Sequence, residues 1–179
     1  MSVKALRCPN CNAPLRQVMG ECAYCGIPLV IDGKKVGINR IDHRKWELRQ
    51  RKGLSMLPNE VRKRIQYPKE TLQTVSPITR TSGRFSKKEL TDFWVITNQR
   101  LIFYWSDSCL EIKFEDFLSA DIISKSGRRL EIGLRISFLA DDKHTYREFL
   151  LGHNPRNTEF IKGYKKSIKK YYDVWLTCK

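Results

Sequence analysis

The chain has 179 residues and carries 34 Lys and Arg against 19 Asp and Glu, a net charge of +15. This length suffices for one domain of about 100–150 residues with a small appendage. No apolar run approaches the roughly 18 residues of a membrane span, and the first residues, MSVKALRCPNC, lack the apolar core of a secretory signal. We therefore expect a soluble, cytoplasmic protein with reduced thiols.

Two copies of the pattern Cys-x-x-Cys-x-x-Pro-Leu open the chain. They place four cysteines at C-x2-C-x10-C-x2-C spacing, namely Cys8, Cys11, Cys22 and Cys25. Four thiolates in two close pairs suit tetrahedral zinc. The residue after each second cysteine, Asn12 or Gly26, tolerates the left-handed turn that points backbone N–H groups at sulfur. Two disulfides are the alternative, and the lack of a secretory signal disfavours them.

The cysteine pattern resembles a small zinc ribbon with two knuckles, and we expect it to span residues 1–39. Four cysteines close the coordination shell and leave no position for water or substrate. We therefore predict one structural Zn²⁺. A segment this short cannot bury a core, so the metal has to supply much of its folding free energy.

Residues 40–70 form a strongly basic linker, with 10 Lys and Arg against 4 Asp and Glu. Its first part, Ile41–Lys52, predicts a helix that ends near Gly53, with Trp46 as its one large anchor. Pro58 and Pro68 bracket a second basic piece. The linker is either a solvated connector or a polyanion-binding surface. In the second case the contacts come from Arg44, Lys45, Arg49, Arg51, Lys52, Arg62, Lys63 and Arg64.

Residues 93–105, FWVITNQRLIFYW, predict a β-hairpin, because two short apolar runs flank a polar break that contains Asn98. Both alternating sets are apolar, so we expect the pair in the middle of a sheet, covered on its outer side by other strands or the C-terminal helix. We assign Phe93, Val95, Leu101, Phe103 and Trp105 to one face, and Trp94, Ile96, Ile102 and Tyr104 to the other.

About seven strand-like runs follow one another at roughly ten-residue spacing between residues 71 and 152, which is typical of a sandwich or barrel. Asn154 and Pro155 then predict the start of a helix, as N-cap and first helical residue. Apolar residues recur in it at helical spacing, as Ile161, Tyr164, Ile168, Tyr171, Tyr172 and Trp175. The opposite side is basic and adds candidate polyanion contacts at Lys162, Lys165, Lys166 and Lys169.

The segment WVITNQRLIFYW is similar to the "TNxRLIFY" strand pair of bacterial PH-like and GRAM-like domains, and LEIKFEDFLSADI and NPRNTEFIKGYKK resemble their next strand and closing helix. The resemblance covers about residues 71–176. It implies a mainly β fold, a seven-stranded PH-like barrel capped by a C-terminal α-helix over residues 71–179. It transfers no catalytic residue, because this barrel binds lipids, peptides or no known ligand.

The sequence lacks a phosphate-binding glycine loop and a nucleophile elbow, so we expect no enzyme and no small-molecule substrate. The favoured function is a non-enzymatic adaptor whose zinc ribbon and PH-like domain dock on a protein partner, with an anionic membrane surface as a weaker variant. The alternative is a nucleic-acid-binding protein that uses the ribbon and the basic linker.

Overall fold

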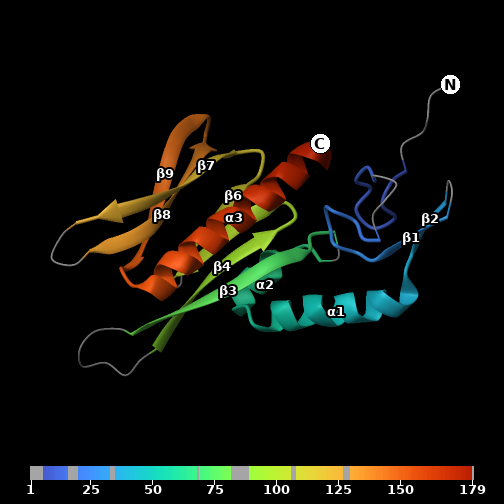
Figure 1. Cartoon of the computed structure of the whole chain (residues 1–179), viewed down its shortest axis with the longest axis horizontal. Coiled ribbons are helices and arrows are strands. Elements are labelled where there is room, and N and C mark those ends of the chain that lie inside the picture. Colours follow the sequence, from blue (N-terminus) through green and yellow to red (C-terminus); the bar gives the residue numbers. More distant parts are fainter. Residues whose placement is uncertain are drawn as a thin grey trace. The chain divides into compact units, whose positions relative to one another are not determined.

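A computed structural model describes residues 6–15, 20–32, 35–67, 69–81, 89–105, 108–126 and 130–178 (Figure 1). The chain forms two compact units. The first contains the residues up to Glu111 together with Val174–Lys179, and the second is Ile112–Asp173. Each unit is treated separately below. The fold is mainly β, with two helices after the first two strands and one helix after the last strand.

The chain begins with two irregular knuckles and then forms a small hairpin of strands β1 (Leu29–Asp32) and β2 (Lys35–Ile38). The pairs Leu29 with Ile38 and Asp32 with Lys35 fix its antiparallel register. The sequence Asp32-Gly33 favours a tight turn between these strands, and Gly33 lies outside the described residues.

The basic linker contains helices α1 (Arg40–Ser55) and α2 (Asn59–Arg64), which confirms the helix predicted around Ile41–Lys52 and extends it. Asn39 begins α1: its carbonyl accepts from the backbone N–H of His43 at 2.9 Å. Trp46 and Gln50 are buried on the inner side of α1, at 4% and 7% exposure. The linker is therefore not a fully solvated connector.

Four strands form an antiparallel sheet in the order β3 (Leu72–Thr81), β4 (Glu89–Thr97), β5 (Arg100–Trp105) and β6 (Ser108–Lys113). The predicted hairpin is β4 and β5, and its place in the middle of the sheet is confirmed. Both faces of this pair are buried, as the exposures of 1% for Trp94 and 0% for Val95 illustrate.

The predicted grouping of residues on the two hairpin faces is wrong. Strand β4 ends at Thr97 and β5 begins at Arg100, so the turn between them has two residues. With this turn length, each odd-numbered residue of β4 pairs with an even-numbered residue of β5. Directly paired residues point to the same face of a sheet. One face therefore combines Phe93 and Val95 with Tyr104 and Ile102, and the other combines Trp94 and Ile96 with Phe103 and Leu101.

Residues of the linker cover the first of these faces. Val95 and Ile102 belong to one buried cluster with Leu57, Val61 and Ile65. These three residues come from the segment around α2, and all are less than 8% exposed. The linker thus forms part of the hydrophobic core of the first unit.

In the second unit, strands β7 (Phe117–Lys125), β8 (Glu131–Ala140) and β9 (Lys143–Gly152) form an antiparallel sheet with β8 in the centre. Asp141 and Asp142 have positive φ angles of 49° and 60°, which suit the two central residues of a tight hairpin turn. Gly133 of β8 lies where a Cβ atom would meet the carbonyl oxygen of Phe149 at 2.6 Å. Only glycine allows this approach.

Helix α3 (Pro155–Cys178) begins as predicted, with the backbone N–H of Asn157 donating to Oδ1 of Asn154 at 2.8 Å. Three residues of its apolar stripe are buried, namely Ile161, Tyr164 and Ile168. The remaining stripe residues are half-buried. All seven predicted strands are present as β3–β9, but the described strands form two separate sheets that are not closed into a barrel.

Candidate metal centre and basic surfaces

The two cysteine knuckles have the same backbone hydrogen bonds, offset by fourteen residues. In the first, the N–H of Cys8 donates to the carbonyl of Ala13 at 2.9 Å, and Asn12 N–H donates back to Cys8 at 2.9 Å. In the second, Cys22 donates to Ile27 at 2.9 Å and Gly26 donates to Cys22 at 2.7 Å. The sequence repeat is therefore also a structural repeat.

The left-handed turns predicted after each second cysteine are confirmed. Asn12 has φ 60° and Gly26 has φ 69°. Asparagine and glycine are the residues that adopt this conformation at little cost. The turn reverses the chain tightly enough for both cysteines of a knuckle to face the same point.

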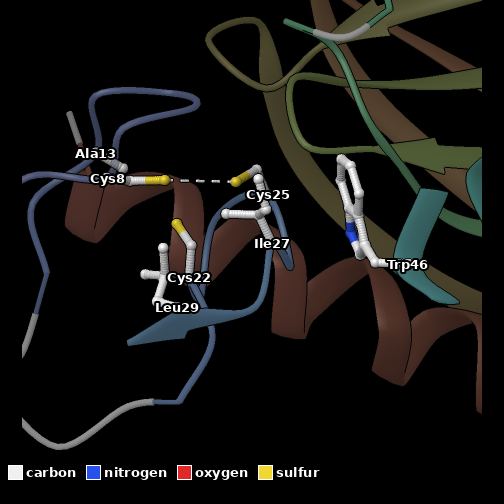
Figure 2. Close-up of a cluster of buried hydrophobic side chains, with 7 residues drawn as sticks. All are labelled: Cys8, Ala13, Cys22, Cys25, Ile27, Leu29 and Trp46. Carbon is white, nitrogen blue, oxygen red and sulfur yellow. Dashed lines mark hydrogen bonds between the residues drawn. The ribbon is translucent and has the colours of Figure 1, made fainter. Parts of the chain in front are cut away.

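The four sulfur atoms of Cys8, Cys11, Cys22 and Cys25 all lie within 4.8 Å of one another. The Sγ atoms of Cys8 and Cys25 are 3.7 Å apart, and those of Cys11 and Cys22 are 3.6 Å apart. Figure 2 shows the Cys8 and Cys25 side chains pointing at each other, with Cys22 beside them. A disulfide would need about 2.05 Å, and these cysteines are free thiols.

The donor set fits a single tetrahedral ion. Zn–S bonds of about 2.3 Å place the sulfur atoms of a regular tetrahedron about 3.8 Å apart. The two distances above are close to this value, and three of the four cysteines are buried. A bound ion would have sulfur on every side and no free position for water.

The four thiols of the cluster influence one another through hydrogen bonds. Hydrogen bonds from the thiol of Cys11, and then from Cys22 and Cys25, hold the pKa of Cys8 far below its usual range. A hydrogen bond with Cys11 lowers the pKa of Cys22 to about 7, whereas the bond with Cys22 raises the pKa of Cys11. The thiols thus share protons unevenly, and one divalent cation would allow all four to act as thiolates.

The second knuckle is attached to the rest of the first unit through three contacts. Trp46 of α1 belongs to the same buried cluster as the cysteines, and a Cβ atom at Gly26 would lie 3.5 Å from its Nε1. The Thr71 hydroxyl donates to the carbonyl of Cys25 at 3.4 Å, and the Gln73 amide donates to the carbonyl of Tyr24 at 3.1 Å. Figure 2 shows the Trp46 ring next to Cys25 and Ile27.

Gln50 extends this attachment from α1 to strand β3. Its side-chain amide donates to the carbonyl of Leu72 at 3.0 Å and accepts from the N–H of Leu72 at 2.8 Å. Buried polar side chains of this kind usually complete the backbone hydrogen bonding of a strand. Sequence reasoning missed Gln50, because a polar residue on a basic helix gives no sign of burial.

A buried ion pair joins the segment before β3 to the central hairpin. The Glu70 carboxylate, with 1% of its side chain exposed, accepts from Nε and Nη2 of Arg100 at 2.8 and 2.7 Å. It also accepts from the hydroxyl of Thr97 at 2.8 Å. The Asn98 side chain accepts from the N–H of Thr71 at 2.8 Å. Three residues of the TNQR motif thus hold the segment around Glu70, a partner that the sequence analysis did not identify.

The predicted polyanion contacts divide into two groups. On α1, the side chains of Arg44, Lys45, Arg49, Arg51 and Lys52 are exposed, and among the described residues the one ion pair of this group joins Lys45 to Asp42 at 3.9 Å. Around α2 the basic residues are engaged within the protein. Arg62 donates to the carbonyl of Leu57 at 3.0 Å, and Arg64 pairs with Glu111 at 2.7 Å. Lys63 is exposed.

The lysines of α3 belong to the second unit. Lys162 pairs with Glu159 at 3.3 Å, and Lys165 lies 3.7 Å from Asp121. Lys166 and Lys169 are exposed. The basic residues of α1 belong to the first unit and these lysines to the second, so the two groups are described separately.

A shallow groove runs between the second knuckle and α1, with a volume of about 560 Å³. Its lining is of mixed charge and consists of Gly20, Glu21, Pro28, Asp42, Lys45 and Arg49. Two of the predicted basic contacts therefore share the lining of this groove with two carboxylates.

Comparisons with known proteins assign no family to this chain. A scan against protein-family models finds no match, and a search of curated proteins finds none that is significantly similar. Within the part of the chain that the structure describes, no helix is both long and apolar enough to cross a bilayer.

Proposed function

We propose that this protein is a non-enzymatic adaptor, in which a zinc ribbon (1–39), a basic helical linker (40–70) and a PH-like domain (71–179) dock on a protein partner. The observation that carries this proposal is the attachment of the metal centre to α1 through Trp46. The metal then acts as a structural support for a surface rather than as a reaction centre.

Zinc is the ion that best matches the cysteine cluster. Four thiolates at tetrahedral spacing favour zinc over harder cations, which prefer oxygen ligands. Bound there, it would be held by Cys8, Cys11, Cys22 and Cys25 and would supply folding free energy to the knuckles. The reducing environment of the cytoplasm, where we place the protein, keeps such thiols available.

The PH-like interpretation draws support from the order of elements. Seven strands, β3–β9, are followed by an amphipathic helix, which is the order expected from the resemblance to PH-like domains. In the second unit, Tyr172 of α3 packs edge-on against Phe114 and Phe117, with ring centroids 5.9 and 4.8 Å away. A helix with these contacts fits the capping role of the C-terminal helix in PH-like domains.

The chemistry of the remaining candidates argues for a non-enzymatic role. Among the described residues, the cysteine cluster is the only group of three or more Cys, His, Asp or Glu positioned to hold a metal. Burial raises the pKa of the Cys109 thiol, so this cysteine stays protonated and is a poor nucleophile. We propose that neither centre performs catalysis.

The adaptor proposal is tested by affinity purification of the tagged, full-length protein, with and without nuclease treatment, followed by mass spectrometry. Specific protein partners should remain after nuclease digestion and should be lost from the Cys22→Ser variant, whose ribbon cannot hold metal. Partners that disappear with nuclease alone would contradict the adaptor function.

A nucleic-acid-binding function is the second candidate, and the exposed arginines of α1 favour it. Binding to phosphates releases counterions, so the affinity should fall with salt at a log–log slope near −0.9 per phosphate contact. Replacing Arg49, Arg51 and Lys52 with Gln should flatten that slope by about three units. Sub-micromolar binding to duplex at about 0.15 M salt would exceed typical non-specific affinity and would favour this candidate.

A further inference from the structure

The outer side of α1 is a continuous cationic surface. With 3.6 residues per turn, its six basic residues cover about half of the helix circumference. All six are exposed: Arg40, Arg44, Lys45, Arg49, Arg51 and Lys52. We call this set, with Leu48, the α1 outer face. Its helix contains only two carboxylates, Asp42 and Glu47.

The cations of the α1 outer face are available to a partner. Apart from the Lys45 contact with Asp42, no ion pair within the described residues engages any of the six. The helix is also held firmly, because Trp46 is buried beside the metal centre and Gln50 is bonded to β3. A rigid surface loses little conformational entropy when it binds, which favours affinity.

Leu48 lies in the middle of the α1 outer face and is 66% exposed, the highest value among the large exposed apolar residues of the described chain. A phosphate backbone offers no apolar surface to cover it. A bilayer would require a wide apolar face, whereas this face has one apolar residue among six cations. A protein segment can supply carboxylates and an apolar side chain together.

The groove at the edge of α1 points to the same class of partner. Glu21 and Asp42 line it beside Lys45 and Arg49. Carboxylates at the border of the surface repel any anionic group placed there, but they can accept hydrogen bonds from the N–H groups of a polypeptide backbone, which a phosphate backbone lacks. The α1 outer face therefore has positive charge at its centre and mixed charge at its border. This pattern favours a protein partner with complementary charges over a uniformly charged polymer.

We propose that the α1 outer face binds an acidic protein segment whose apolar side chain packs on Leu48, with its carboxylates paired to the surrounding arginines and lysines. This inference rests on the adaptor function proposed above and specifies its docking surface. Arginine suits such pairing, because its planar guanidinium can hold a carboxylate through two hydrogen bonds.

The test uses the full-length, zinc-loaded protein and a fluorescent Glu-rich peptide of about 20 residues, long enough to form a helix, with Leu along one side. Binding is followed by anisotropy at about 0.15 M salt, where charges more than about 8 Å apart are screened. Arg44→Gln, Arg49→Gln and Lys52→Gln together should weaken binding at least about tenfold. Leu48→Ser should weaken it about tenfold through loss of apolar burial.

Helix α3 provides matched controls for both changes. Lys162→Gln, Lys166→Gln and Lys169→Gln together remove the same charge, and Leu176→Ser removes an apolar side chain that is 49% exposed. Neither control should change the affinity by more than about twofold. Equal losses in the α1 and α3 variants would overturn the proposal, as would an unchanged affinity in Leu48→Ser.

Two further probes separate the classes of partner. Duplex DNA and phosphatidylserine vesicles should bind more weakly than the peptide, and tighter binding of either would overturn the proposal. If the partners purified from cells cross-link to residues 71–179 but not to α1, the inference fails while the adaptor function stands. If no nuclease-resistant protein partner is found, the adaptor function itself fails.

Discussion

The carboxylate of Glu70 and the guanidinium of Arg100 form a two-point ion pair, although the residues are 30 positions apart in the chain. Burial alone would lower the pKa of Arg100, but its hydrogen bond to Glu70 and the charges of Glu70 and Glu111 raise it. Arg100 also donates to the carbonyl of Arg64 at 2.6 Å. One arginine thus fixes both the end of α2 and the segment that enters β3.

Removing one partner of this pair should be costly. Glu70→Ala leaves the Arg100 charge half-buried without its main partner and should lower the free energy of unfolding by about 3–5 kcal/mol. Chemical denaturation monitored by Trp fluorescence measures this loss. Arg64→Gln removes only an exposed partner of Glu111 and should cost much less. Equal losses in the two variants would show that the Glu70 pair contributes no more than a surface contact.

Removal of the metal should destabilise α1. Protein purified without chelator should contain one equivalent of zinc by elemental analysis, and Cys22→Ser should contain much less. Because Trp46 is buried beside the cysteines, chelation should increase hydrogen exchange in residues 40–55. The peptides of β8 and β9 serve as the internal control, since they belong to the second unit. Unchanged exchange in α1 after zinc removal would contradict the supporting role of the metal.

Two glycine substitutions should have opposite effects on the free energy of unfolding. Gly133→Ala introduces a Cβ atom 2.6 Å from a backbone oxygen of the neighbouring strand, so we expect a loss of about 1–3 kcal/mol. Gly163→Ala introduces one into open space within α3 and should stabilise by about 0.5–1 kcal/mol. Thermal unfolding of the two variants and the wild type measures both changes in stability. A stabilising Gly133→Ala would show that β8 and β9 are further apart than described.

Alkaline pH should destabilise the second unit through Tyr164. Burial raises the pKa of this phenol well above its ordinary value. The neutral form is therefore favoured in the folded state. The resulting stability is fully present below the unfolded pKa of about 10 and is lost as the pH rises above it.

The matching variant is Tyr164→Phe, which cannot ionise and should lose less stability between neutral pH and about pH 11 than the wild type. Tyr146→Phe is the control, because Tyr146 is 57% exposed. Urea unfolding at several pH values measures both. Parallel curves for wild type and Tyr164→Phe would rule out a contribution from this residue.

The knuckles and the hairpin were predictable because their information is local. Cysteine spacing determines which sulfur atoms can meet, and the turn residues Asn12 and Gly26 have the expected conformation. The hairpin strands follow from their apolar residues. The pairing of the two strands could not be predicted in this way, because a change of one residue in the turn length reverses which side chains share a face. The alternation of residues within each strand carries no information about the length of the turn.

The role of the linker was only partly predictable. Its helix and the anchor Trp46 can be read from the sequence, and both are confirmed. The burial of Gln50 and Glu70 could not be predicted from the sequence. Polar side chains become buried only when a partner, here distant in the chain, forms hydrogen bonds with them. Such partners are set by the tertiary fold, which a single sequence does not display.

The two knuckles have unequal surroundings. Cys22 and Cys25 lie in the knuckle that α1 and β3 hold, whereas Cys11 of the other knuckle is the only one of the four cysteines of the cluster that is not fully buried. A bound ion would be held by one anchored pair, Cys22 and Cys25, and by one less enclosed pair, Cys8 and Cys11. Exchange kinetics should therefore respond more strongly to changes around Cys11 than the equilibrium affinity does.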